Sequence, residues 1–153
     1  MDDVVIVGGG IIGAATAYFL SKEGRKVKVI ERDPTYKSAS FPLSLGGFRR
    51  QFYQKENILL GKFARDFIFK IPELLKTEKN PNPTASMVPN GYLLMFGPND
   101  AEEQYRALEN HKDCEAGTKN IKGSDLSKVF PYINSEGIET ATYTDNKSEG
   151  WID

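Results

Sequence analysis

The chain opens with a short run of apolar residues that is closed by glycines. Residues 4–7 read Val-Val-Ile-Val, and Gly8, Gly9 and Gly10 follow directly. A short, β-branched, continuous apolar run is typical of a strand that is buried on both faces. The pattern therefore predicts a buried strand at 4–7 that ends in a glycine turn.

Helical and extended patterns follow in turn. Residues 14–17 include three small alanines, the bulky residues 18–20 follow, and Gly24 stands where a glycine commonly ends a helix. Apolar residues then alternate through 27–30 and stop at the acidic Glu31. The order of strand, glycine turn, helix and strand predicts an α/β unit with two parallel strands.

The glycines of the turn have the spacing of a dinucleotide-binding motif. Gly8, Gly10 and Gly13 fit G-x-G-x-x-G, in which the first allows a sharp turn and the second lets the backbone approach a pyrophosphate. The third glycine lets the helix lie close to the strands. A helix that begins near Ile11 would direct free N–H groups at the phosphates. Such a motif alone is weak evidence, and the alternative is a turn without a ligand.

Glu31 adds chemical detail to this prediction. A carboxylate at the end of the second strand can accept hydrogen bonds from a ribose diol. It also disfavours a 2′-phosphate, so FAD or NAD is a better candidate than NADP.

A long segment without periodicity follows at 35–50. Loops of this length are uncommon in compact domains unless they are functional. Ser40 and Ser44 offer hydroxyls for phosphates, and the backbone of Gly46 and Gly47 could approach a flat ring closely. The alternative is an exposed linker.

Two arginines end this loop. A guanidinium group at Arg49 or Arg50 suits an anionic flavin or a substrate carboxylate. The alternative is that both arginines pair with surface acids, and Arg49 is the favoured candidate for a ligand.

The rest of the chain predicts a mixture of helices and strands. The elements expected are a helix at 55–71, a strand at 91–96, a helix capped by Asn99 or Asp100, a short helix at 124–130 and a strand at 138–144. The first of these helices has an apolar stripe of Leu60, Phe63, Phe67, Ile71 and Leu74, and the second has Ala101, Tyr105 and Leu108 on its expected inner face. A turn-rich stretch at 78–83 suggests domains at 1–80 and 81–153.

Composition narrows the classes of function. Twenty Lys and Arg against 21 Asp and Glu give a net charge of −1, which makes no electrostatic case for nucleic acid or an anionic membrane. The uncharged run at the start is too short and too rich in glycine for a membrane span, and it follows Met1-Asp2-Asp3, so a cytoplasmic protein is expected. His111 and Cys114 are the single histidine and cysteine, so we expect no metal site and a surface or half-buried pair.

Three segments together resemble the N-terminal part of a known family, the FAD-dependent oxidoreductases of the D-amino-acid oxidase type. The nearest branch contains sarcosine oxidase and dehydrogenase. The segments are the start at 5–13 with Glu31-Arg32-Asp33, the loop from Ala39 to Arg49, and the late residues Pro131, Gly137-Ile138 and 149–153. The resemblance covers nearly the whole chain.

The resemblance implies an α/β fold with a Rossmann-like FAD-binding half and part of a mixed α+β substrate domain. It implies oxidation of a small-molecule amine or amino acid, with hydride transfer from the carbon bearing nitrogen to flavin N5 and hydrolysis of the resulting imine. The catalytic residues stay unknown. The residues implied to hold FAD are Gly8, Gly10, Ile11, Ile12 and Gly13 at the pyrophosphate, Glu31 and Arg32 at the adenosine end, and Ser40, Ser44, Gly46, Gly47 and Arg49 along the phosphates and flavin.

The chain departs from this family in length. Members are more than twice as long, so the chain is expected to be a truncated member that exposes sheet edge and apolar surface, and that is weakly stable or prone to aggregate. We expect no turnover without a partner, such as the C-terminal half or another subunit. Two alternatives stay open: a non-catalytic FAD-binding module that acts by assembly, and an NAD-linked dehydrogenase, which the loop argues against.

Overall fold

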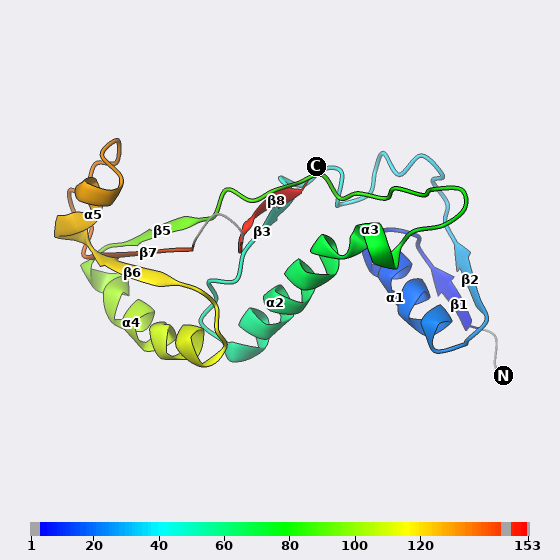
Figure 1. Cartoon of the computed structure of the whole chain (residues 1–153), viewed down its shortest axis with the longest axis horizontal. Coiled ribbons are helices and arrows are strands. Elements are labelled where there is room, and N and C mark those ends of the chain that lie inside the picture. Colours follow the sequence, from blue (N-terminus) through cyan, green and yellow to red (C-terminus); the bar gives the residue numbers. More distant parts are fainter. Residues whose placement is uncertain (1–3, 145–147, 153) are drawn as a thin grey trace. The chain divides into compact units, whose positions relative to one another are not determined.

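The computed structural model describes residues 4–144 and 148–152 (Figure 1). The chain divides after Gly46 into two compact units, which are described separately below. The domain limits 1–80 and 81–153 expected from the sequence stay a prediction, because compact units of one chain need not coincide with functional domains.

The first unit has the predicted order of elements. Strand β1 (Val4–Val7) leads to helix α1 (Ile11–Lys22) and then to strand β2 (Val27–Ile30). The strands are parallel, with Val4 opposite Val27 and Val7 opposite Ile30. Gly24, with a φ of +77°, follows the end of α1, where a left-handed residue commonly closes a helix. The α/β prediction is confirmed here.

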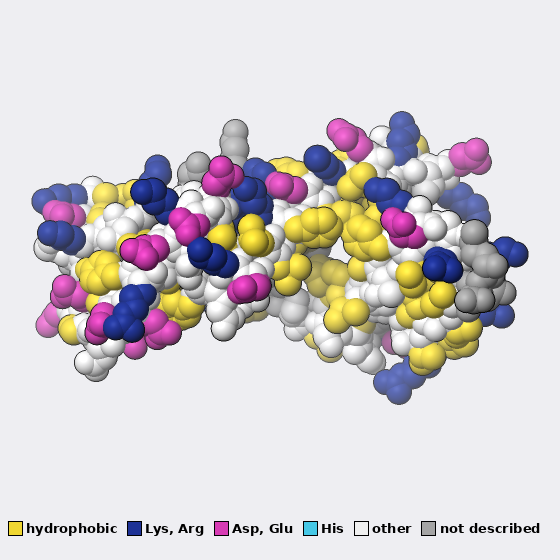
Figure 2. All heavy atoms as spheres, turned by 90° about the horizontal axis from the view of Figure 1, so that it is seen from below, with side chains coloured by type: hydrophobic (Ala, Val, Ile, Leu, Met, Phe, Trp, Pro, Cys, Tyr) yellow, Lys and Arg dark blue, Asp and Glu magenta, His cyan; other side chains and the backbone are white. Residues whose placement is uncertain are grey.

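The first strand is more exposed than its sequence suggested. Val5 is 55% exposed and Val7 is 85% exposed, and α1 buries none of its residues completely. Among the described residues the sheet of this unit has two strands, and α1 alone cannot cover both faces. The prediction of a strand buried on both faces is therefore wrong for this chain, whereas the expected exposure of apolar surface is present. Figure 2 shows hydrophobic side chains on the surface of this part, at the right of the view.

The second unit is a mixture of helices and antiparallel strands. Its helices are α2 (Lys55–Phe69), α3 (Ile71–Leu74), α4 (Pro98–Asp113) and α5 (Gly123–Val129). Its strands are β3 (Gly47–Phe48), β4 (Met87–Val88), β5 (Leu93–Phe96), β6 (Lys119–Lys122), β7 (Thr140–Tyr143) and β8 (Gly150–Ile152). They form two antiparallel sheets, in the orders β3-β8-β4 and β5-β7-β6. Strands β3, β4, β6 and β8 have no counterpart among the sequence predictions.

Helix α2 buries its predicted apolar stripe only in part, because Phe67 is half-buried whereas the stripe residues nearer the start of the helix are exposed. Ile58 is completely buried, whereas Leu60 and Phe63 are 65% and 56% exposed. The backbone of Arg49 passes close to the helix at Gly61, where a Cβ atom would lie 2.9 Å from the Arg49 carbonyl oxygen. The contact with residues 49–52 therefore decides which face is buried.

Helix α4 begins two or three residues earlier than predicted, and its buried face agrees with the prediction only in part. Gly97 is its N-cap and Pro98 is its first residue, and no side chain caps it. Pro at the first position is favourable because it needs no N–H partner there. The buried residues are Ala101, Gln104, Ala107 and His111. The predicted cap is therefore wrong and so is the inward position of Tyr105, whereas Ala101 is buried as predicted and Leu108 is half-buried.

His111 and Cys114 are buried, which corrects the expectation of a surface or half-buried pair. Their exposed fractions are 3% and 6%. Cys114 packs in a core cluster with Ile58 and Ala116, and His111 Nε2 lies 2.8 Å from the Phe52 carbonyl oxygen. Burial lowers the pKa of His111, which keeps the imidazole neutral at pH 7.

Within the described ranges, no three or more His, Cys, Asp or Glu side chains are grouped to hold a metal ion. Among the same residues, no helix is both long enough and apolar enough to cross a membrane.

Candidate functional site

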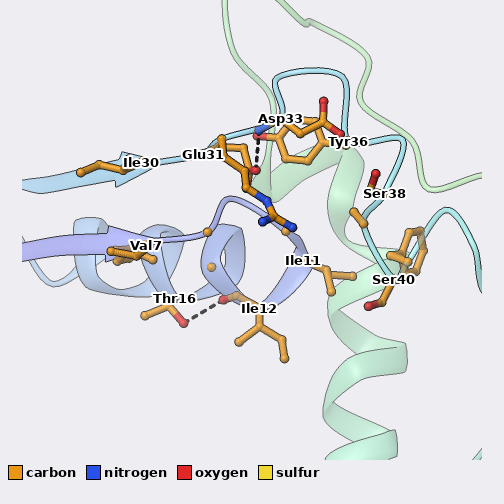
Figure 3. Close-up of a pocket in the computed structure, with 17 residues that line it drawn as sticks. Val7, Ile11, Ile12, Thr16, Ile30, Glu31, Asp33, Tyr36, Ser38 and Ser40 are labelled. Atoms are coloured by element: carbon orange, nitrogen blue, oxygen red, sulfur yellow. Dashed lines mark hydrogen bonds between the residues drawn. The ribbon is translucent and has the colours of Figure 1, made fainter.

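A cavity of about 780 Å³ lies in the first unit, where both strands end and α1 begins (Figure 3). Ile6 to Gly8 and Gly10 to Gly13 line it from the end of β1 and the start of α1. Thr16 of α1, the end of β2 and the segment after it line the rest, with Ile30 to Asp33, Tyr36, and Ser38 to Phe41. The carboxyl ends of parallel strands are where α/β proteins bind ligands.

The three motif glycines have different surroundings. Gly8 has a φ of +99°, which a residue with a side chain rarely adopts. A Cβ atom on Gly13 would lie 1.9 Å from the Gly8 carbonyl oxygen, so only glycine lets α1 pack this closely on the turn. A Cβ atom on Gly10 would meet nothing within 4 Å. The backbone at Gly10 is therefore open to the cavity, which fits a pyrophosphate.

The start of α1 supplies hydrogen-bond donors to the same cavity. Gly10 is the N-cap and no side chain caps the helix, and the first turn has no acidic residue. The first N–H groups of a helix have no partner within it, and the helix dipole favours an anion at this end. The glycine turn and the helix start thus form a cradle for phosphate groups.

Glu31 connects this turn to the segment after β2. Its Oε2 accepts the Gly9 N–H at 2.6 Å, and its Oε1 accepts the Asp33 N–H at 2.8 Å. The hydrogen bond from Asp33, followed by that from Gly9, lowers the pKa of Glu31, so the group is ionised at neutral pH. Each carboxylate oxygen retains capacity for another donor, as the predicted ribose contact requires.

Acid is expected to break this connection. Because the folded pKa of Glu31 lies below its ordinary 4.5, its stabilising contribution is complete above that value and is lost as the pH falls through the folded pKa. The amide proton of Gly9, followed by NMR, should therefore shift only below pH 4.5. In a Glu31→Gln variant this titration should disappear, and a midpoint at or above 4.5 in the original protein would contradict the assignment.

The cavity brings together eight of the twelve predicted cofactor residues. These are Gly8, Gly10, Ile11, Ile12, Gly13, Glu31, Arg32 and Ser40. Ser44 is used locally, since its hydroxyl donates to the Phe41 carbonyl oxygen at 2.8 Å and accepts the Gly46 N–H at 3.1 Å. Gly46 ends the first unit, and Gly47 and Arg49 belong to the second. Contact of all twelve with a cofactor stays a prediction.

Several cavity residues were not identified from the sequence. Asp33 accepts the N–H and the hydroxyl of Thr35 at 3.0 and 2.6 Å, which turns the chain after β2. The turn brings Tyr36 to the cavity, where its hydroxyl oxygen lies 2.8 Å from the position of a Cβ atom on Gly9. The other unpredicted residues include Thr16, Ser38 and Phe41. The sequence Asp-Pro-Thr at 33–35 was the available signal, because Asp side chains commonly cap turns in this way.

The parallel strands, the glycine turn and the cavity at their carboxyl ends define an α/β protein that binds a dinucleotide. The sequence model of the FAD dependent oxidoreductase family, DAO, matches residues 3–153, and the chain belongs to this family. FAD is accordingly the cofactor, which confirms the preference for FAD over NAD. The open glycine cradle and Glu31 suit the pyrophosphate and ribose of FAD.

Similar proteins extend over more than this chain. FAD-dependent oxidoreductase domain-containing protein 1 of Xenopus laevis is 40% identical over 99% of the chain, which spans 31% of that protein. L-proline dehydrogenase from P. horikoshii has a TM-score of 0.75 and 25% identity, over 99% of this chain and 38% of that one. Glycine oxidase from Geobacillus kaustophilus shares the fold, with a TM-score of 0.72 and 21% identity. The match covers 98% of this chain and 40% of the oxidase chain. The predicted fold class is thus confirmed, and the chain spans about a third of its curated relatives.

Proposed function

We propose that this chain forms the N-terminal, FAD-binding part of an oxidoreductase that oxidises a small-molecule amine or amino acid. The observation that carries the proposal is the cavity at the open start of α1, where Gly10 leaves the backbone accessible and Glu31 is ionised. Support for the substrate class comes from similar structures whose names state that they act on proline or glycine.

The residues of the first unit would hold the adenosine diphosphate portion of FAD. The N–H groups at the start of α1 would bind the pyrophosphate, and Glu31 would accept the ribose hydroxyls. Arg32 and Ser40 line the same cavity and supply a cation and a hydroxyl for the adenosine end and the phosphates. Gly46, Gly47 and Arg49 stay candidates for the flavin end.

When bound, FAD supplies a two-electron acceptor for the hydride of the carbon that carries nitrogen. The part of this chain in that reaction is binding and orientation of the cofactor. In the proposed reaction, water would hydrolyse the resulting imine to a carbonyl compound and to ammonia, or to an amine where the nitrogen carries a substituent.

Titration of the purified chain with FAD and with ADP tests the proposal. We expect both compounds to bind, with a change in the visible spectrum of FAD, and to compete for one site. Because the chain spans about a third of its relatives, we expect no bleaching of the flavin when amines or amino acids are added. Absence of FAD binding contradicts the cofactor site, and amine-dependent bleaching contradicts the predicted lack of turnover.

A non-catalytic FAD-binding module that acts through a partner is the second candidate. It is favoured by exposed apolar side chains in the first unit, including Ile12 at 81%, Leu43 at 73% and Leu45 at 96%. Large exposed apolar patches commonly mark interaction surfaces. Co-expression with the remaining two thirds of a relative distinguishes the two. Restored amine oxidation supports the enzyme, whereas a stable complex with FAD and without turnover on a panel of amines and amino acids supports the module.

A further inference from the structure

The second unit contains a completely buried carboxylate at Glu149. Its Oε1 accepts the backbone N–H of Arg50 at 2.5 Å and that of Gln51 at 3.0 Å. Its Oε2 accepts the side-chain amide of Gln51 at 2.8 Å and the hydroxyl of Thr144 at 2.7 Å. A buried carboxylate is costly unless donors surround it, and here four donors do so. Three of the four come from residues 50–51.

The residues next to Glu149 hold the preceding part of the same segment. Strand β8 pairs with β3, so Trp151 lies opposite Gly47 and Gly150 lies opposite Phe48. Gly150 must be glycine, because a Cβ atom there would lie 2.0 Å from the Val88 carbonyl oxygen. Residues 149–151 thus fix the backbone from Gly47 to Gln51 through a strand ladder and a carboxylate.

Tyr92 contacts both ends of the segment 47–51. Gln51 Nε2 donates to the Tyr92 carbonyl oxygen at 3.1 Å. The hydroxyl oxygen of Tyr92 lies 2.3 Å from the position that a Cβ atom on Gly47 would take, so Tyr92 leaves no room for a side chain at Gly47. Both ends of the segment 47–51 are therefore held.

The two arginines in this segment differ in accessibility. Arg50 is 6% exposed and its Nη2 donates to the Glu115 carbonyl oxygen at 2.6 Å. Arg49 is exposed, and its guanidinium carbon lies 5.0 Å from the centre of the Phe52 ring. Arg49 is thus the arginine that a dissolved anion can reach, which agrees with the preference from the sequence.

We propose that Glu149 is a positioning residue for the cofactor end of this protein. By accepting the N–H groups of Arg50 and Gln51, it fixes the backbone on which Gly47 and Arg49 are presented. The inference rests on the proposed function, in which Gly47 and Arg49 are candidates for the flavin end. Glu149 itself is completely buried, so its role would be exerted through the backbone of Arg50 and Gln51.

A Glu149→Gln variant tests this role, because it keeps the size of the side chain and removes the charge. We expect the amides of Arg50 and Gln51 to exchange with solvent about tenfold faster, since hydrogen bonds to a charged acceptor are stronger than those to a neutral one. We also expect the dissociation constant of FAD to rise about tenfold, while that of ADP changes less than about twofold. The ADP measurement separates the two ends of the cofactor.

Thr144→Val is the matched control. It removes one donor from Oε2 and leaves both backbone N–H groups on Oε1, so stability should fall while FAD affinity stays within about twofold. A purely structural role predicts instead that FAD affinity falls in both variants in proportion to their stability. If Glu149→Gln does not fold, Glu149→Asp keeps the charge and should retain part of the FAD affinity.

Each outcome bears on a defined claim. The positioning role is overturned if the Glu149→Gln variant folds and its affinity for FAD is unchanged. It is also overturned if the amides of Arg50 and Gln51 exchange fast in Glu149→Asp while the affinity for FAD stays unchanged. Both results leave the proposed function intact. If the unchanged protein binds neither FAD nor ADP, the proposed function is overturned, and the positioning role is overturned with it.

Discussion

A Gly10→Val variant is expected to lose FAD and ADP binding by at least about a hundredfold while it stays folded. Gly10 has a φ of −60° and a ψ of −177°, which any residue adopts, and a Cβ atom there meets no protein atom within 4 Å. The valine side chain would occupy the space that the backbone offers to a pyrophosphate. Since valine is a poorer N-cap than glycine, a stability loss of about 1 kcal/mol is expected.

Calorimetric titration with ADP and FAD, together with urea unfolding, measures both effects. Ser21→Val places the same side chain on an exposed position of α1 outside the cavity and should bind both compounds normally. Unimpaired binding by Gly10→Val would remove the phosphate cradle from the proposed function.

Gly13→Ala should show the opposite behaviour, with a loss of about 3 kcal/mol or more in the free energy of unfolding of the first unit. The added Cβ atom would lie 1.9 Å from the Gly8 carbonyl oxygen and 3.0 Å from the carbonyl carbon. Helix propensity alone predicts a gain of about 1 kcal/mol for this exchange. The sign of the measured change therefore decides whether close packing or propensity dominates.

Urea unfolding and amide exchange in α1 provide that measurement. Ser21→Ala on the same helix serves as the control, because it changes propensity at an exposed position without a clash. An increase in stability of Gly13→Ala would show that α1 can move away from the turn, against the packing observed.

The glycine turn was predictable because its determinants lie within a few residues of one another. Spacing alone identified the tight turn at Gly8 and the close packing at Gly13, and the structure confirms both. The role of Glu31 in holding Gly9 was not predictable, since it depends on how the loop folds back after Asp33. Periodicity contains no information about such a turn.

Burial in the second unit was harder to predict. An acid in a short polar stretch, such as Glu149, is typical of a solvent-exposed loop. Its partners at Arg50 and Gln51 are 99 and 98 positions away in the chain. On α4, Ala101 was predicted on the inner face together with the large side chains of Tyr105 and Leu108. Ala101 is buried, but the other buried positions include Ala107 and Gln104, whose Nε2 lies 3.4 Å from the Thr142 hydroxyl oxygen. Contacts distant in sequence decide these positions.

The hydrogen bonds of Glu31 have a consequence for the thermodynamics of cofactor binding. Gly9 and Asp33 are held by a carboxylate of the protein itself, so the shape of the turn does not depend on a ligand. A cofactor that enters such a turn does not have to order it, and less conformational entropy is lost on association. The first unit is in this respect preorganised, and its affinity for ADP should depend on the charge of Glu31 through the shape of the turn as well as through the proposed ribose contact.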